Sequence, residues 1–157
     1  MNNGDIRTSI MDSIRKIVRS LRLASSAAEK DLGLNAAQLF VLQQLTEGQR
    51  LSINEIAART HTHQSSVSVV VGRLHDQGLV SRAPSSEDGR RMEVSLTTKG
   101  RNLCKKAPRA AQENMLGAIS ALTPEEQKTL AVLLDKLVRG SSFDREPASL
   151  FFEDDSP

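Results

Sequence analysis

Hydrophobic positions near the amino terminus recur at spacings of three and four residues, the period of an amphipathic helix. The stripe consists of Ile6, Ile10, Ile14, Ile17, Val18 and Leu21, with basic residues between them. It predicts a long helix over residues 5–32 that ends at Gly33. Asn35 and Gln38 have the spacing of a capping box, which predicts a second helix through Leu45.

The next segment predicts two short helices in succession. Ser52 and Glu55 have the spacing of a capping box, in which the two residues satisfy each other's exposed N–H groups at a helix start. The polar run 60–62 interrupts this helix, and a new helix is expected from near His63 to Gly78. Its buried face would contain Val67, Val70 and Leu74. Two short helices separated by about four residues indicate a helix-turn-helix.

The pattern then changes to short runs that are typical of strands. The runs 79–82 and 92–96 are joined by residues 84–91, which are rich in turn-forming residues and basic at the tip. These features predict a β-hairpin.

Two more helices complete the predicted elements. The first is expected to be capped by Thr97 or Thr98 and to continue to about Ser120. The second begins at residues 123–126, where a threonine cap, a proline at the first helical position and an acidic first turn coincide. It is expected to end at Gly140.

A helix-turn-helix followed directly by a hairpin is a winged helix, so the predicted fold is mainly α-helical with a small β-wing. The winged helix-turn-helix domain would span residues 47–97. The helices on either side, over 5–46 and 98–140, would form a dimerisation region. Residues 141–157 mix small, acidic and apolar side chains and are expected to form a loosely held tail.

The outer helices offer more apolar surface than a small winged helix can cover. In the last helix this surface consists of Leu130, Val132, Leu133, Leu134, Leu137 and Val138. A self-complementary two-fold interface would bury it, which predicts a homodimer. The alternative is a compact monomer in which these helices pack on their own domain.

The net charge is only +2, but it is unevenly distributed. Residues 50–109 contain eleven Lys and Arg against five Asp and Glu, while the rest of the chain contains ten against fourteen. A basic central region suits a polyanion, because neutralised phosphates release counterions. Taken alone, the asymmetry is also compatible with an ordinary fluctuation of surface charge.

Composition argues against several classes of protein. With four Phe and no Trp or Tyr, recognition of RNA or single-stranded DNA by ring stacking lacks its main support. No apolar run is long enough to span a bilayer, and the amino terminus lacks the features of a signal peptide, so we expect a cytoplasmic protein without a membrane partner. No motif for nucleophilic, zinc or phosphate-cradling chemistry is present, so we expect neither an enzyme nor a cofactor.

Small polar residues crowd the start of the second helix of the predicted helix-turn-helix. They are His63, Gln64, Ser65, Ser66 and Ser68. An α-helix that enters the major groove would meet base edges and phosphates at this point, so we predict that these residues contact DNA. The alternative is a solvated helix surface. Arg73 and Arg82 are expected to contact phosphates, although a surface salt bridge explains each of them equally well.

The predicted wing contains three short motifs: Asp88-Gly89-Arg90, Val94-Ser95-Leu96-Thr97 and Lys99-Gly100. With these motifs, residues 51–100 resemble the winged-helix region of MarR-type (multiple antibiotic resistance regulator) transcription factors. The flanking helices extend the resemblance to roughly residues 5–140. The resemblance implies an obligate homodimer that presents two winged helices to a pseudo-palindromic operator in double-stranded DNA.

The resemblance also implies roles for wing residues. Arg90 would enter the minor groove, and Asp88 would hold the wing in shape. Arg91, beside the tip, either assists or faces water. Val69 stands where relatives often carry a basic residue; it can touch a thymine methyl group but cannot hydrogen-bond to guanine. This difference leaves the operator sequence undetermined. It does not change the expected mode of binding.

Regulation is implied only by the resemblance. It suggests a repressor released by a small anionic or phenolic effector that binds between the dimerisation helices and the winged domain. Phe40, Met115 and Arg15 are candidates for that cleft, but each is explained more simply as core or exposed surface, so the ligand site is unknown. The alternative function is a winged helix that binds a protein partner in place of DNA.

The histidine and cysteine residues are candidates for other chemistry. His61 and His63 lie two residues apart across a helix start, and neither Cys nor paired carboxylates cluster with them or with His75, so we expect no metal site. Cys104 is followed by two lysines, which could lower its pKa. A single Cys in a helix interior is more often a small buried hydrophobic residue, and we favour that interpretation.

Overall fold

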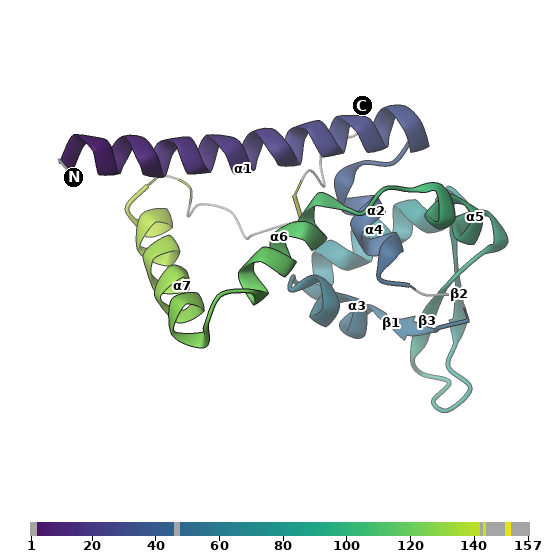
Figure 1. Cartoon of the computed structure of the whole chain (residues 1–157). Coiled ribbons are helices and arrows are strands. Elements are labelled where there is room, and N and C mark those ends of the chain that lie inside the picture. Colours follow the sequence, from purple (N-terminus) through teal and green to yellow (C-terminus); the bar gives the residue numbers. More distant parts are fainter. Residues whose placement is uncertain (1–2, 46–47, 142, 144–149, 152–157) are drawn as a thin grey trace.

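The computed structural model describes residues 3–45, 48–141, 143 and 150–151 (Figure 1). The helices are α1 (Asn3–Leu32), α2 (Ala36–Gln43), α3 (Ile53–Thr60), α4 (Gln64–Asp76), α5 (Thr98–Lys106), α6 (Ala111–Ser120) and α7 (Pro124–Arg139). The strands are β1 (Leu51–Ser52), β2 (Val80–Pro84) and β3 (Met92–Leu96). The mainly helical fold with a small wing is therefore confirmed.

Helix starts follow the local signals of the sequence. At α2 the Asn35 Oδ1 accepts the Gln38 N–H at 2.8 Å, and the Gln38 Oε1 accepts the Asn35 N–H at 3.0 Å. Ser52 and Glu55 form the same reciprocal pair at α3, and α7 begins in this way at Thr123. Because each box satisfies N–H groups that the helix leaves unpaired, it stabilises that start independently of the rest of the fold.

The core lies where α2 and the residues before it pack against the winged helix. Its fully buried side chains are Leu34, Phe40, Val41, Leu42, Ile56, Val67, Val70, Val71, Leu74, Val80 and Val94. The predicted inner face of α4 is thereby confirmed. Burying this face against α2 and α3 leaves the opposite face of α4 in solvent.

The wing belongs to a three-stranded antiparallel sheet in the order β1-β3-β2. In the hairpin, Val80 pairs with Leu96 and Pro84 with Met92. On the other side of β3, the pairing ends where Ser52 meets Glu93. The predicted hairpin is confirmed, but β1 was not foreseen because a strand of two residues has no readable period. Figure 1 shows the tip of the hairpin projecting from the end of the molecule opposite α1.

The continuous helix expected over 98–120 is wrong, because this segment forms two helices. Pro108 has no N–H to donate, and its ring disfavours the helical conformation of Ala107, which is extended (φ −76°, ψ 140°). The Gln43 side chain binds both sides of the break: its Nε2 donates to the Pro108 carbonyl at 2.7 Å, and its Oε1 accepts the Ala110 N–H at 2.8 Å. The break allows α6 to leave the winged helix and lead to α7.

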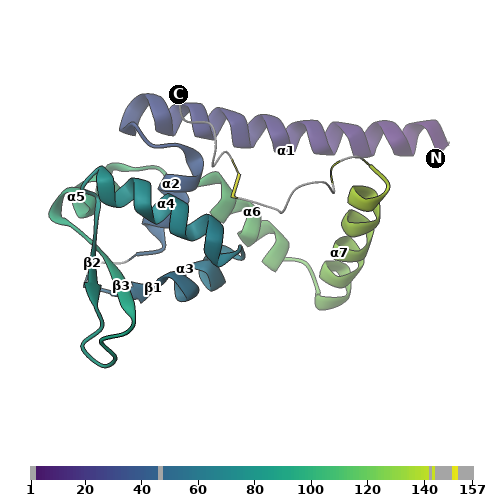
Figure 2. The same cartoon turned by 180° about the vertical axis from the view of Figure 1, so that it is seen from behind.

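The outer helices expose their apolar stripes. Among the α1 residues whose burial is described, 4–32, only Leu21, Ser25 and Ala28 are buried, and α7 buries no residue. The exposed apolar side chains are Ile6, Ile10, Met11, Ile17, Val18 and Leu23 on α1, and Val132, Leu133, Leu134, Leu137 and Val138 on α7. Figures 1 and 2 show α1 extending beyond the winged helix, with α7 beside its amino-terminal half.

Most of the predicted tail, 141–157, lies outside the described residues. At Leu150 the expectation of a loosely held tail is wrong, because this side chain is 5% exposed and packs against the core. The burial of one apolar side chain holds the chain against the domain at this point.

Candidate nucleic-acid interface and ligand cleft

The exposed face of α4 begins with short polar side chains. Gln64, Ser65 and Ser68 are exposed, Ser66 is half-buried, and Val69 is 48% exposed. His63 occupies the N-cap position without a side-chain hydrogen bond to the helix. The structure therefore places the predicted contact residues on one accessible helix end, where N–H groups and the helix dipole favour phosphate.

The wing tip is closed by short hydrogen bonds around Asp88. The Asp88 Oδ1 accepts the backbone N–H of Arg90 at 3.1 Å, and the Asp88 carbonyl accepts the N–H of Arg91 at 2.9 Å. The Ser85 N–H then donates to the Arg91 carbonyl at 2.7 Å. These bonds keep the turn narrow and leave Arg90 exposed. Within the described parts of the chain, no ion pair involves the Arg90 guanidinium.

A surface hollow joins the wing to the helix-turn-helix. It has a volume of about 680 Å³ and lies between the wing and the starts of α3 and α4. Arg90 lines it from the wing, and Gln64 lines it from the first turn of α4. The predicted minor-groove and major-groove residues therefore border the same side of the molecule.

The two other predicted phosphate contacts lie near α4. Arg82 is exposed on β2, and its Nη2 lies 3.6 Å from the position that a Cβ would take at Gly72. Arg73 is the next residue on α4 and is half-buried. The structure thus brings Arg82 close to α4 beside Arg73.

Arg91 differs from Arg90 because its guanidinium binds side chains at the start of α3. The Arg91 Nη2 lies 2.7 Å from the Glu55 Oε2 and donates to the Ser52 Oγ at 2.9 Å. Glu55 has a pKa lowered from 4.5 to about 2, first because it accepts the Ser52 backbone N–H, then because of the Ser52 hydroxyl and Arg91. The carboxylate therefore stays ionised through the physiological range.

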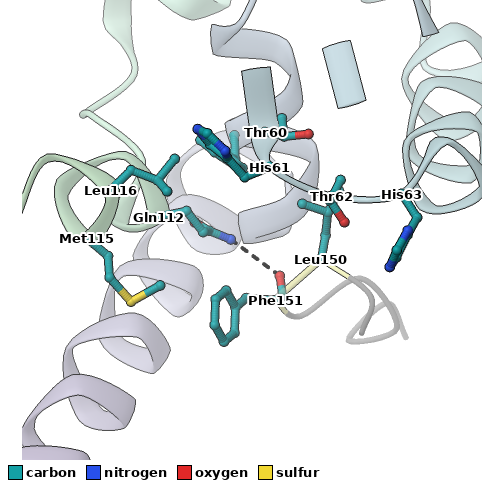
Figure 3. Close-up of a pocket in the computed structure, with 10 residues that line it drawn as sticks. Thr60, His61, Thr62, His63, Gln112, Met115, Leu116, Leu150 and Phe151 are labelled. Carbon is teal, nitrogen blue, oxygen red and sulfur yellow. Dashed lines mark hydrogen bonds between the residues drawn. The ribbon is translucent and has the colours of Figure 1, made fainter. Parts of the chain in front are cut away.

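A second candidate site is a cleft between α6 and the turn that precedes α4 (Figure 3). Its volume is about 280 Å³. The lining residues are Phe40, Thr60, His61, Thr62, His63, Gln112, Met115, Leu116, Leu150 and Phe151. Phe40 and Met115 were candidates for such a cleft, whereas Arg15 does not line it.

Gln112 is a buried polar side chain in the wall of this cleft. It is 3% exposed, and its Nε2 donates to the Phe151 carbonyl at 3.4 Å. Its Oε1 is buried without a hydrogen-bond partner among the described residues. Sequence reasoning missed Gln112, Leu150 and Phe151, because nothing in their local pattern shows that the chain returns to α6.

Two of the histidines line the cleft, and the cysteine lies on α5. His61 and His63 line the cleft, and in the described ranges no three metal-ligating side chains gather. His61 ends α3 in the left-handed conformation (φ 51°). Burial raises the pKa of the Cys104 thiol, and this half-buried side chain packs against the core, which supports the interpretation as a small hydrophobic residue in part.

The α3–α4 helix-turn-helix, the β2–β3 wing and the polar face shared between them define a winged helix-turn-helix protein of the transcription-regulator class. A family model described as MarR family matches residues 32–91. With the relatives below, this match shows that the chain belongs to the MarR family, as the wing motifs predicted. The family also confirms the prediction that the chain is not an enzyme.

The relatives match most of the chain. The HTH-type transcriptional repressor Rv2887 of Mycobacterium tuberculosis is 31% identical over 117 residues, covering 74% of this chain and 84% of the relative. The HTH-type transcriptional repressor MdtR of Bacillus subtilis is 30% identical over 143 residues, covering 91% and 90%.

Among solved structures, BpsR of Bordetella bronchiseptica has a TM-score of 0.55 and 25% identity, covering 82% of this chain and 98% of BpsR. That structure is described as showing the regulation of DNA binding by 6-hydroxynicotinic acid.

None of the helices in the described part of the chain combines the length and the apolar character that a membrane span requires.

Proposed function

We propose that this chain is a repressor that binds a pseudo-palindromic operator in double-stranded DNA as a homodimer, and that a small molecule releases it. The observation that carries the proposal is the hollow bordered by Gln64 of α4 and Arg90 of the wing. A helix end and a slender basic hairpin on one side of a molecule match a major groove and the minor groove beside it. The relatives Rv2887 and MdtR, both described as repressors, support this function.

The proposed contacts divide by the chemistry of each side chain. His63, Gln64, Ser65, Ser66, Ser68 and Val69 would face base edges and nearby phosphates in the major groove. Arg73 and Arg82 would bind phosphates and set the register without reading bases. Arg90 would enter the minor groove, and Asp88 would hold the turn that presents it. The winged helix over 47–97 thus binds DNA, and the regions 5–46 and 98–140 hold two copies together.

The exposed stripes of α1 and α7 support the homodimer. Contiguous exposed apolar surface of this kind is rare on a soluble monomer unless a partner covers it. A groove of about 670 Å³ between α1, α6 and α7, lined by Ile17, Leu21 and Ile119 among others, continues the same surface. A second copy related by a two-fold axis would bury both stripes and present two α4 helices to successive major grooves.

The cleft beside α6 suits the effector. Its walls are mostly apolar, and the buried Gln112 Oε1 is an acceptor without a partner among the described residues. A small aromatic molecule with a hydroxyl or N–H donor would satisfy this oxygen. Because His61, Thr62 and His63 lead directly into α4, a ligand that prefers one position of this turn shifts α4 relative to α6.

Titration of duplexes tests DNA binding. The parent and Arg90→Ala are titrated with promoter-derived and random duplexes at several salt concentrations. The affinity of the parent should fall steeply with salt because phosphate contacts release counterions, and Arg90→Ala should lose about 1–3 kcal/mol of binding free energy. Equal, salt-insensitive binding by both proteins would contradict the proposal and favour the protein-interaction alternative.

A further inference from the structure

We propose that Arg91 is a positioning residue: through Glu55 and Ser52 it holds the wing against the start of α3, and it makes no contact with DNA itself. This inference rests on the proposed DNA-binding function and refines the role of one predicted contact. We call Arg91, Glu55 and Ser52 the wing anchor.

The wing anchor is a closed set of hydrogen bonds around one carboxylate oxygen. The Glu55 Oε2 lies 2.7 Å from the Arg91 Nη2 and accepts the Ser52 N–H at 2.7 Å and the Ser52 hydroxyl at 2.8 Å. The Arg91 Nη2 also donates to the Ser52 Oγ at 2.9 Å. The guanidinium thus binds a carboxylate that the capping box has already oriented, so less side-chain entropy is lost in forming the pair.

The position of Arg91 explains what the anchor holds. Pairing between β1 and β3 ends at Glu93. From Met92 to the tip, therefore, no third strand among the described residues pairs with the hairpin. A two-stranded hairpin alone is only marginally stable. Arg91 lies beyond that last pair, and its main chain closes the turn through Asp88 and Ser85. The anchor therefore attaches the wing to the start of α3 at Arg91, the residue next to Arg90.

The charges argue against a phosphate contact for Arg91. Its side chain is 47% exposed and that of Glu55 is 48% exposed, so the pair adds little to overall stability. If the guanidinium moved to a phosphate, the ionised Glu55 would be left without its arginine near DNA. In the proposed role, the pair restricts the directions available to Arg90 before DNA arrives, which lowers the entropy lost on binding.

Glu55→Gln distinguishes the two roles of Arg91 by the sign of its effect. Glutamine keeps the N3 side chain of the capping box but removes the charge that binds Arg91. If Arg91 positions the wing, Glu55→Gln weakens DNA binding about two- to fivefold, the range expected for losing one exposed ion pair. If Arg91 contacts a phosphate, Glu55→Gln frees the guanidinium and removes a negative charge, so binding strengthens. Stronger or unchanged binding overturns the proposal.

Thermodynamic coupling provides a second measurement. If the anchor acts through Arg90, then Arg90→Ala costs less affinity in the Arg91→Ala background than in the parent. Arg91→Ala also leaves the slope of log K against log salt unchanged, whereas loss of a phosphate contact reduces it by about 0.9. Additive effects of the two substitutions, or a reduced slope, overturn the proposal.

Glu126→Gln is the matched control. Glu126 occupies the same N3 position in the capping box of α7, and the structure records no arginine partner for it among the described residues. This variant should bind DNA as the parent does, and thermal unfolding monitors the folding of each variant. A loss of affinity equal to that of Glu55→Gln would overturn the proposal.

Measurements on the free protein keep this inference separate from the proposed function. In ¹⁵N relaxation experiments without DNA, Glu55→Gln and Arg91→Ala should lower the order parameters of residues 85–91 and leave those of α4 unchanged. Unchanged order parameters at the wing overturn the proposal. Failure of the parent to bind any duplex defeats the proposed function instead.

Discussion

At the scale of single residues, Gly100 shows how one missing side chain sets the spacing of the fold. It lies in the first turn of α5, and a Cβ there would collide with the carbonyl oxygen of Leu79. That carbonyl also accepts the Thr97 N–H at 3.1 Å, so the start of α5 crosses the chain that leads into β2 at close range. The motif containing Gly100 was visible in the sequence, but its reason is visible only in the packing.

We predict that Gly100→Ala destabilises the winged helix by about 1–3 kcal/mol, because the neighbouring atom is backbone and the cost is that of overpacking. Chemical denaturation measures the loss. Gly117→Ala in α6 is the control, since a Cβ there meets no atom within 4 Å, and it should be neutral or slightly stabilising. Equal stability of the two variants would contradict this reason for Gly100.

At the scale of elements, local signals predicted the helix starts well and one helix interior badly. The capping boxes at Asn35 and Ser52 were predicted from the sequence and are confirmed, because each depends on residues three positions apart. Of the two caps considered for α5, Thr97 or Thr98, the structure shows Thr97. The break at Pro108 was also locally encoded, but the prediction continued one helix from the threonine cap to about Ser120. The break matters because it carries α6 to the cleft that we propose for the effector.

We predict that Gln112→Met weakens effector binding about tenfold, because the variant loses a buried hydrogen-bond acceptor while keeping a similar volume. The probes are 6-hydroxynicotinic acid and simple hydroxylated aromatic acids, measured by calorimetry and by release of the protein from DNA.

Gln44→Met is the control for the cleft. Gln44 makes a comparable bond from its Nε2 to the Phe40 carbonyl at 3.1 Å but does not line this cleft. Its substitution should leave probe binding unchanged. An unchanged affinity of Gln112→Met for a probe that releases the parent from DNA would place the effector elsewhere.

At the scale of the whole molecule, the exposed apolar stripes of α1 and α7 are the surfaces that the proposed homodimer would bury. Helix α7 is 16 residues long and has no buried side chain, although Leu133, Leu134 and Leu137 are 49–58% exposed. The apolar period of this helix predicted an interface, and the described residues of the chain leave that face exposed.

We predict that Leu133→Glu combined with Leu137→Glu converts the dimer to monomers, because each carboxylate would be buried without a partner in the interface. Sedimentation velocity measures the mass. Affinity for a two-half-site operator should fall about a hundredfold, because each half-site then binds on its own. Circular dichroism should show an unchanged helix content, since neither side chain is buried within its own chain. Retention of the dimer would contradict this interface.

Local patterns in the chain were enough to predict most of the helices and their caps, the buried and exposed faces of α4, the wing and the family motifs around Arg90. Which distant groups meet became clear only from the packing. Arg91 reaches the cap of α3, and Leu150 and Phe151 return to Gln112. The reason is physical. Periodicity and capping act over a few residues, whereas contacts between groups far apart in the chain depend on how the assembled elements pack, which no local pattern records.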